Sequence, residues 1–379
     1  MSAGVGHAPR PPQGCAACAR RSWLLGELSA ALDLYARDSD RLVALLALPD
    51  EELLRAVAGR RARELEARYA ARTGQPPACA PPEQESVCRH GDCYPTTLRA
   101  VTGPALLHVA GGSQRLAEIT ARPVVAILGS TRASDYGMQV SSSLGRGLAA
   151  SGVTLASTMA DGIAAAAHAG ALERAGATIA VLDGGLGRPA ARRRRLAQRV
   201  CQAGCAISEL AHDVAPRRWA QLASQRLTIA LAQVVVVVEA SERPRELAGA
   251  RMAQALDRTL GAVPGRVTST LSAGTNALLT DGAVIIRSAA DVLELLEPMQ
   301  AESATAAPAP TPAPQLDGRL RWTLDQVGQG CDTARKLTLG GADPAEVLMS
   351  LTELELMGLL ARGDGGRYIA RELPPPPSR

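Results

Sequence analysis

The chain has 379 residues, a formal net charge of +4 at pH 7 and an apolar fraction of 46%. This length predicts two or three domains, and no apolar stretch approaches the ~18 residues of a membrane span. Residues 1–14 lack the apolar segment of a secretory signal, so we expect a cytoplasmic protein whose eight cysteines are thiols or metal ligands rather than disulfides.

Residues 1–86 are predicted to form an N-terminal helical domain. Leu, Val and Ala recur at helical spacing in 22–36 and 51–72, and Pro49 followed by acidic residues is typical of a helix start. Residues 74–86 are rich in proline and polar side chains, which indicates the end of this domain.

Residues 87–298 follow a different pattern, in which short apolar strands alternate with helices. The strands are predicted at 124–130, 153–158, 178–183, 206–210, 233–240, 261–265 and 283–286. Such alternation predicts an α/β domain with an extended, Rossmann-like parallel sheet. Ligands of such sheets bind beyond the carboxyl ends of the strands, so the loops that follow the strands are the candidate sites.

Residues 299–317 are predicted to be an extended Pro/Ala linker. Residues 318–379 are predicted to form a small winged-helix-like domain, with helices at 333–341 and 344–360 and a hairpin at 361–370. The longer helix carries three glutamates and no Lys or Arg, so we expect this domain to bind protein rather than DNA.

The loop after the strand at 124–130 has a composition that suits an anion. A strand-to-helix turn opens onto a helix N-terminus, where unpaired N–H groups and the helix dipole favour negative charge. Gly129 permits close approach, Ser130 and Thr131 can donate hydrogen bonds, and Arg132 supplies charge. The dinucleotide fingerprint and the P-loop lysine pattern are missing. The sequence therefore predicts a phosphate site unlike a standard NAD or ATP site, with an ordinary turn as the alternative.

Other loops predicted at the same sheet edge carry small, hydroxyl or basic residues. Together with the first loop they supply the candidate nucleic-acid contacts, which are Gly129, Ser130, Arg132, Gly137, Thr158, Gly162, Arg188, Arg193, Arg226, Gly265, Gly274, Thr275 and Asn276. Several such loops suit a polyanion better than a mononucleotide. The arginine run 192–195 also fits a solvated helix face. We find no nucleophile–base pair and no paired carboxylates, so no enzymatic activity is predicted.

The blocks "VAILGSTRASDYG", "TIAVLDGGLGRP", "VVVVVEASER" and "AVPGRVTSTLSAGTNALLTDGA" together resemble the DNA-processing protein A family (DprA, also called Smf). The resemblance spans roughly residues 88–297. It implies a homodimer that binds and protects single-stranded DNA and loads the RecA recombinase during natural transformation, without enzymatic activity. It also implies an N-terminal helical, SAM-like domain and a C-terminal winged helix.

The chain departs from the family pattern at several positions of the expected pocket. Thr131 stands where the family has its first arginine, Thr158 replaces a glycine and Ala164 replaces an aspartate. Residues 224–226 read S-Q-R instead of R-N-R, and residues 244–247 read P-R-E-L instead of S-G-S/A-L. Because the apolar strands are intact, we expect the fold to persist and the DNA site to be weaker or rearranged.

Cys15, Cys18, Cys88 and Cys93 are candidate metal ligands, with His90 between the last two. Four thiolates could hold a structural zinc ion in tetrahedral geometry. Free thiols in a reducing compartment are the alternative, and no other cofactor is predicted.

Two other functions stay open. One is a Rossmann-like nucleotide phosphoribohydrolase-type enzyme, which would need a P-G-G-x-G-T-x-x-E motif; residues 263–269 and 274–278 lack its glycine pair and its glutamate. The other is a diverged paralogue that has lost tight DNA binding.

Overall fold

The computed structural model describes residues 14–72, 84–99, 101, 103–187, 191–304, 316–329, 331–339, 342–357, 359–362 and 368–370. The described residues fall into two compact units, which meet in sequence between Thr305 and Ala306. Within the described ranges, no helix is both long enough and apolar enough to cross a membrane.

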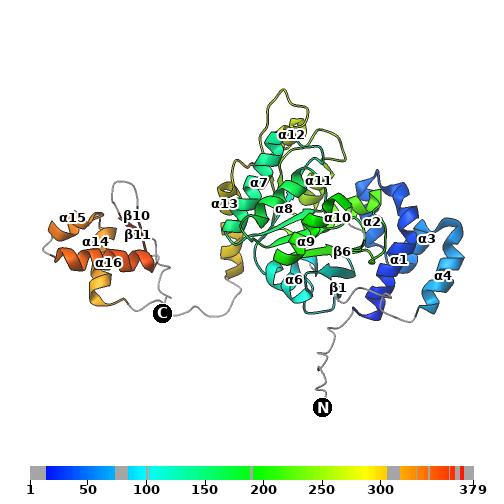
Figure 1. The fold of residues 1–379 in the computed structure, drawn as a ribbon, viewed down its shortest axis with the longest axis horizontal. Helices are drawn as coiled ribbons and strands as arrows, with labels where there is room; N and C mark the ends of the chain where they lie inside the picture. The colour runs from blue at the N-terminus through cyan, green and yellow to red at the C-terminus, as the bar shows by residue number, and fades with distance from the viewer. Residues whose placement is uncertain are drawn as a thin grey trace, which may run out of the picture. The chain divides into compact units, whose positions relative to one another are not determined.

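Helices form the N-terminal part of the first unit (Figure 1). In the described residues they are α1 (Ala16–Leu32), the 3-10 helix η1 (Asp33–Tyr35), α2 (Ser39–Ala47), α3 (Asp50–Val57), the 3-10 helix η2 (Gly59–Arg61) and α4 (Ala62–Ala71). Leu24, Leu28 and Leu32 recur at helical spacing on α1 and are fully buried. They belong to the same hydrophobic core as Trp219, so these helices pack against the sheet domain.

Nine strands form one sheet in the described residues. They are β1 (Gln84–Cys88), β2 (Leu106–Ala110), β3 (Val124–Leu128), β4 (Thr154–Thr158), β5 (Thr178–Val181), β6 (Cys205–Ser208), β7 (Val234–Val237), β8 (Thr259–Ala262) and β9 (Val284–Ile285). Their order is β1-β2-β6-β5-β4-β3-β7-β8-β9. The strands from β6 to β9 in this order are parallel, whereas β2 joins β6, and β1 joins β2, in antiparallel fashion. The predicted parallel α/β sheet is therefore confirmed, with an antiparallel extension at one edge.

Helices cover both faces of this sheet (Figure 1). They are α5 (Thr96–Arg99), α6 (Ser113–Thr120), α7 (Asp135–Ala150), α8 (Ile163–Leu172), the 3-10 helix η3 (Ala191–Arg193), α9 (Arg194–Ala203), α10 (Arg218–Leu231), α11 (Ala248–Ala255), α12 (Ala273–Thr280) and α13 (Ala289–Ala304). Side chains of a strand alternate between the two faces. Val125 and Ile127 accordingly pack with α7, α8 and α13, whereas Val124, Ala126 and Leu128 pack in the core that contains α10 and α11.

The chain direction across the sheet reverses at β3. From β3 the chain passes through α7 to β4 on one side, and it later returns through α10 to β7 on the other side. Val125 pairs with Val234, and Leu128 pairs with Val237, so the carboxyl ends of β3 and β7 are level. A parallel sheet opens a ligand crevice at such a reversal.

The second unit contains α14 (Gly318–Gly328), α15 (Ala334–Leu339), α16 (Pro344–Leu356) and the antiparallel pair β10 (Leu360–Arg362) and β11 (Tyr368–Ala370). Its core includes Leu324, Leu337 and Leu351. Asp343 caps α16 by accepting a hydrogen bond from the N–H of Glu346 at 3.2 Å, and Pro344 begins the helix. The identification of this unit with the winged-helix fold stays a prediction.

Candidate nucleic-acid interface

Glu239, a buried residue just after β7, lies at the reversal point between β3 and β7. Its carboxylate accepts hydrogen bonds from the backbone N–H and from the hydroxyl of Ser134, both at 2.7 Å. Ser134 is the N-cap of α7, and its hydroxyl also accepts a hydrogen bond from the N–H of Gly137 at 3.1 Å. The helix N-terminus that the sequence offers to a phosphate therefore binds a carboxylate of the protein itself.

Gly129 and Ser130 hold the first loop against the backbone that follows β7. The N–H of Ser130 donates to the carbonyl oxygen of Glu239 at 2.7 Å, and a Cβ on Gly129 would approach that oxygen to 2.9 Å. Ser130 is buried, whereas Thr131 and Arg132 are exposed. The guanidinium of Arg132 makes no ion pair or hydrogen bond with the described residues. Arg132 is thus the predicted contact in this loop that the structure leaves accessible to a ligand.

The loop after β4 is joined to the first loop through Gly162. This residue has a φ of 68°, and a Cβ there would overlap the carbonyl oxygen of Ser130. The N–H of Ile163 donates to the same carbonyl at 3.2 Å. Thr158 is half-buried at the end of β4. A glycine is required at position 162 because two backbone segments approach each other closely there. No ligand is needed to explain this glycine.

Arg193 fixes this loop through an ion pair and a backbone hydrogen bond, and its side chain is only partly exposed. Its Nε lies 3.0 Å from the Asp161 carboxylate, and its Nη1 donates to the carbonyl oxygen of Met159 at 2.6 Å. The hydrogen bond from Arg193 lowers the pKa of Asp161, and Arg192 forms a second ion pair with that carboxylate. Arg193 thus forms a structural ion pair, and its contact with DNA stays a prediction. Arg188, also predicted as a contact, lies outside the described residues.

Arg226 on α10 is buried and paired with Glu209 at 3.0 Å, and the two side chains are only 11% and 7% exposed. Both residues line a cavity of about 350 Å³ together with Arg21 and Arg89. The guanidinium of Arg226 is held by a buried carboxylate, and the DNA contact at Arg226 stays a prediction.

Gly265, Gly274, Thr275 and Asn276 fix the loop after β8. The Asn276 amide donates to the carbonyl oxygen of Gly265 at 3.2 Å and accepts from its N–H at 3.1 Å. Thr275 is fully buried, and a Cβ on Gly274 would overlap the carbonyl oxygen of Ser241. The structure thus uses these four predicted contact residues to shape the loop, while the neighbouring Arg266 and Val267 are exposed.

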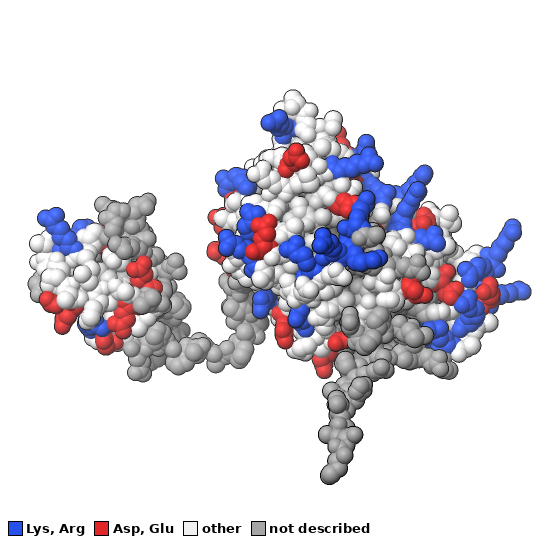
Figure 2. Space-filling view, viewed as in Figure 1, with Lys and Arg blue, Asp and Glu red and all other residues white. Residues whose placement is uncertain are grey.

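A cavity of about 550 Å³ lies between the N-terminal helices and the loop after β7. Five exposed arginines and one aspartate account for its charged lining, and they are Arg37, Arg218, Arg243, Arg245, Arg251 and Asp33. We call this cavity the basic groove. In Figure 2, blue side chains gather over the region where Figure 1 places α2, α10 and α11.

The aspartate of the basic groove is already engaged. Asp33 accepts a hydrogen bond from the N–H of Trp219 at 3.1 Å, in the first turn of α10, and lies 3.9 Å from the guanidinium of Arg217. In contrast, Arg218 and Arg243 form no ion pair with the described residues. Arg251 donates to a backbone carbonyl at 2.7 Å. The groove therefore holds an excess of positive charge that a polyanion could neutralise.

A second group of exposed arginines lies on and next to α9, and its members are Arg192, Arg194, Arg195 and Arg199. Figure 2 shows blue side chains over this helix, which Figure 1 labels. The group agrees with the solvated helix face that the arginine run predicts.

None of the five arginines of the basic groove is among the predicted contacts. Arg37 comes from the N-terminal helical region and Arg251 from α11, so neither follows a strand of the sheet. Only the tertiary structure brings them beside Arg243. The sequence places Arg218, Arg243 and Arg245 in or next to loops that follow strands of the sheet, but it gives no such signal for Arg37 or Arg251.

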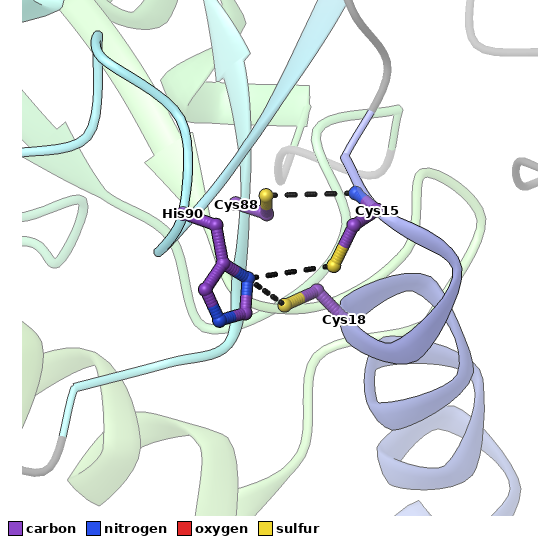
Figure 3. Close-up of side chains that lie close together, drawn as sticks. All are labelled: Cys15, Cys18, Cys88 and His90. Carbon is purple, nitrogen blue, oxygen red and sulfur yellow. Dashed lines mark hydrogen bonds between the residues drawn. The ribbon is translucent and has the colours of Figure 1, made fainter.

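Three of the four predicted zinc ligands come together, and they are Cys15, Cys18 and Cys88. The fourth group in the cluster is His90 instead of Cys93, whose thiol lies 3.8 Å from Oε1 of Gln114. The backbone N–H of Cys18 lowers the pKa of the Cys15 thiol to about 7. This cluster lies where α1 begins beside the end of β1 (Figure 3).

Comparison with known protein families gives a match over residues 85–297 to the family model "DNA recombination-mediator protein A". The chain is 38% identical over 267 residues to the putative DNA processing protein DprA of Mycobacterium tuberculosis, covering 69% of this chain and 67% of the relative. It is 31% identical over 298 residues to protein Smf of Escherichia coli, covering 75% of this chain and 77% of the relative.

Two solved structures share the fold. DNA processing protein A from Streptococcus pneumoniae aligns with a TM-score of 0.57 and 24% identity, covering 75% of this chain and 98% of that one. DNA processing protein A from Helicobacter pylori, whose structure is described as showing a single-stranded DNA binding mode, aligns with a TM-score of 0.51 and 27% identity. That alignment covers 57% of this chain and 97% of the other.

Proposed function

The chain belongs to the DNA recombination-mediator protein A family, and from this premise we propose that it binds single-stranded DNA along the basic groove at the carboxyl edge of its sheet. The observation that carries the proposal is the charge of that groove. Five exposed arginines line it, and its aspartate already caps α10. A chain of phosphates supplies the complementary charge.

The distribution of positive charge favours a strand over a small nucleotide. Arg132 and Arg266 are exposed on neighbouring loops of the same edge, and α9 presents further arginines. A mononucleotide could neutralise only a few of these groups, whereas a single strand can contact them in succession. Aromatic residues make up only 2% of the chain, so base stacking has few platforms and we expect affinity to depend mainly on charge.

The family relationship supports a cellular role in recombination. We propose that the DNA-bound chain acts as a homodimer that loads RecA onto single strands in the cytoplasm, with no catalytic step. In this proposal the N-terminal helical domain (1–86) and the DNA-binding domain (87–298) act together at the groove, and the C-terminal domain (318–379) contacts protein.

The test is fluorescence anisotropy of a labelled thymidine oligonucleotide with the full-length protein. The double variant Arg218→Ala/Arg243→Ala removes two groove charges and should raise Kd at least about tenfold, because each charge-assisted hydrogen bond contributes about 1.5–3 kcal/mol. The slope of log Kd against log salt should fall by about 1.4, which is about 0.7 for each lost phosphate contact.

The control Arg122→Ala/Arg174→Ala removes the same charge from the opposite edge of the sheet. Both residues are exposed, and they precede β3 and β5. This control should bind DNA nearly as wild type does. A groove variant that binds as tightly as this control would show that the DNA site lies elsewhere.

Arg132→Ala tests whether the strand also crosses the first loop. Because Arg132 is exposed and makes no contact with the described residues, its loss should weaken binding while stability stays within about 0.5 kcal/mol. Unchanged affinity would confine the DNA path to the groove.

A further inference from the structure

Four side chains with metal-binding atoms gather at the junction of α1 and β1. Cys15 and Cys18 lie at the N-terminus of α1, Cys88 ends β1, and His90 lies in the turn that follows. Their sulfur and ring-nitrogen atoms all lie within 4.8 Å of one another. Figure 3 shows the four side chains close together, with Nδ1 of His90 facing the sulfurs of Cys15 and Cys18 and the Cys88 sulfur facing the backbone nitrogen of Cys15.

Two of the distances between these atoms agree with the edges of a zinc tetrahedron. Zinc–sulfur bonds of about 2.3 Å and zinc–nitrogen bonds of about 2.0–2.1 Å place sulfur and nitrogen ligands about 3.6 Å apart. Nδ1 of His90 lies 3.4 Å from Sγ of Cys15 and 3.6 Å from Sγ of Cys18. Only small movements of the side chains would then be needed to seat an ion.

The surrounding backbone holds this arrangement from both segments. The N–H of Cys15 donates to Sγ of Cys88 at 3.5 Å, which stabilises negative charge on that sulfur. The N–H of Gly91 donates to the carbonyl oxygen of Cys88 at 2.8 Å, and this turn brings His90 back toward the sulfurs. Gly14 lies close enough to Cys88 that a Cβ there would be 3.1 Å from the Cys88 Cβ.

We propose that Cys15, Cys18, Cys88 and His90 bind one structural zinc ion. Three thiolates and one imidazole form a closed, four-coordinate donor set that favours zinc over oxygen-preferring cations. Four protein ligands leave no open position for a substrate, which assigns the ion a structural role. Cys18 and Cys88 are buried, so the ion would lie largely shielded beside the protein core.

The ion would join the first helix of the chain to the sheet edge. Its ligands lie on residues 15–18 and 88–90, so the metal closes a long loop that contains all the N-terminal helices. Closing a long loop restricts the unfolded chain, so zinc should stabilise the packing of these helices on the sheet.

The experiment measures zinc in the full-length protein, purified under reducing conditions with a tag that does not bind metals. Mass spectrometry of the elements should find about one zinc per chain. Cys18→Ser and Cys88→Ser should lose it, with zinc affinity falling by more than the roughly 10–100-fold expected for an outer-shell change. Cys93→Ser is the matched control, because Cys93 is a neighbouring thiol outside the cluster, and it should retain its zinc.

A second pair of variants separates ligand loss from misfolding. His90→Ala should bind zinc weakly, whereas His90→Cys should restore a four-ligand site and stoichiometric zinc. Cobalt(II) added to metal-free protein should give thiolate charge-transfer absorption that is reduced in Cys88→Ser and retained in Cys93→Ser.

Three results would overturn the proposal. The first is reduced wild-type protein that neither contains zinc nor competes for it with a colorimetric chelator. The second is equal zinc loss in the Cys93→Ser and Cys88→Ser variants. The third is a chain that is isolated metal-free with a Cys15–Cys18 disulfide and that still does not bind zinc after the disulfide is reduced. This result would assign the cluster to redox chemistry.

Discussion

The carboxylate of Glu239 and the hydroxyl of Ser134 lie 2.7 Å apart at the point where the sheet reverses direction. The backbone N–H of Ser134 donates to the same carboxylate. A buried carboxylate thus satisfies the donors at the start of α7 that a phosphate would otherwise bind. The proposed DNA path through the loops and the basic groove leaves this occupied helix start aside.

Glu239→Ala should destabilise the fold, because it leaves the two half-buried donors of Ser134 without this acceptor. A hydrogen bond to a charged group contributes about 1.5–3 kcal/mol, so we expect a loss of at least about 2 kcal/mol in the free energy of unfolding. Urea denaturation measures this. Glu242→Ala is the control: Glu242 is exposed in the same loop and should change stability by no more than about 0.5 kcal/mol.

Arg226→Ala should act on stability and not on DNA binding. The substitution leaves Glu209 as a buried carboxylate without this partner, and breaking such a pair costs about 3–5 kcal/mol. Thermal denaturation should show the loss. Anisotropy below the lowered melting temperature should give the wild-type Kd, and a selective rise in Kd with unchanged stability would restore Arg226 as a DNA contact.

Stability should decrease as the pH falls from about 6.5 toward 4. Burial lowers the pKa of both His108 and His168 to about 4, whereas histidine in an unfolded chain has a pKa near 6.5. Below about pH 6.5 the unfolded state binds more protons, so the stability that is complete above this pH is progressively lost. Each histidine should contribute up to about 1.4 kcal/mol per pH unit.

The variant His168→Asn isolates one of these contributions. Urea midpoints at pH 7 and pH 5 should differ less in the variant than in wild type, even if the variant is less stable at both. An unchanged difference would mean that His168 does not titrate differently in the folded and unfolded chains.

Deleting residues 306–379 should leave single-stranded DNA affinity unchanged. In this second unit, Glu346 and Glu355 are exposed on α16, and Glu353 pairs with Arg319 at 2.8 Å. These carboxylates would repel phosphates, whereas Leu348 and Met349 are 54% and 60% exposed and offer an apolar contact to protein. Loss of DNA binding by a truncated protein that keeps its circular dichroism would show that the second unit contacts DNA.

The central strands could be predicted from the sequence because their composition is compatible with few other structures. Val124–Leu128 and Val234–Val237 are uninterrupted apolar runs, as expected for parallel strands buried on both faces. Gln84–Cys88 could not be recognised in the same way. It begins with polar residues, forms the sheet edge through pairing with β2, and starts inside the segment that its composition assigns to a domain boundary.

The candidate site was less predictable from the sequence, because a glycine can serve either of two structural purposes. A glycine that lets a phosphate approach the backbone and one that lets another backbone approach look alike in a sequence. Gly162 is of the second kind. In the sequence, Glu239 falls at the end of a predicted strand. Its hydrogen bond to Ser134 depends on the pairing of β3 with β7, which the sequence does not show. Arg37 and Arg243 become neighbours only after the N-terminal helices dock.

The contacts between loop backbones at the carboxyl edge have a consequence for how this surface can change over generations. Gly129, Gly162 and Gly274 let neighbouring loops touch through their main chains, and Asn276 fastens its loop through the main chain of Gly265. The exposed side chains on these loops take no part in that framework. Basic side chains can therefore be gained or lost by single substitutions at exposed loop positions such as Thr131, without disturbing the main-chain contacts that these glycines permit.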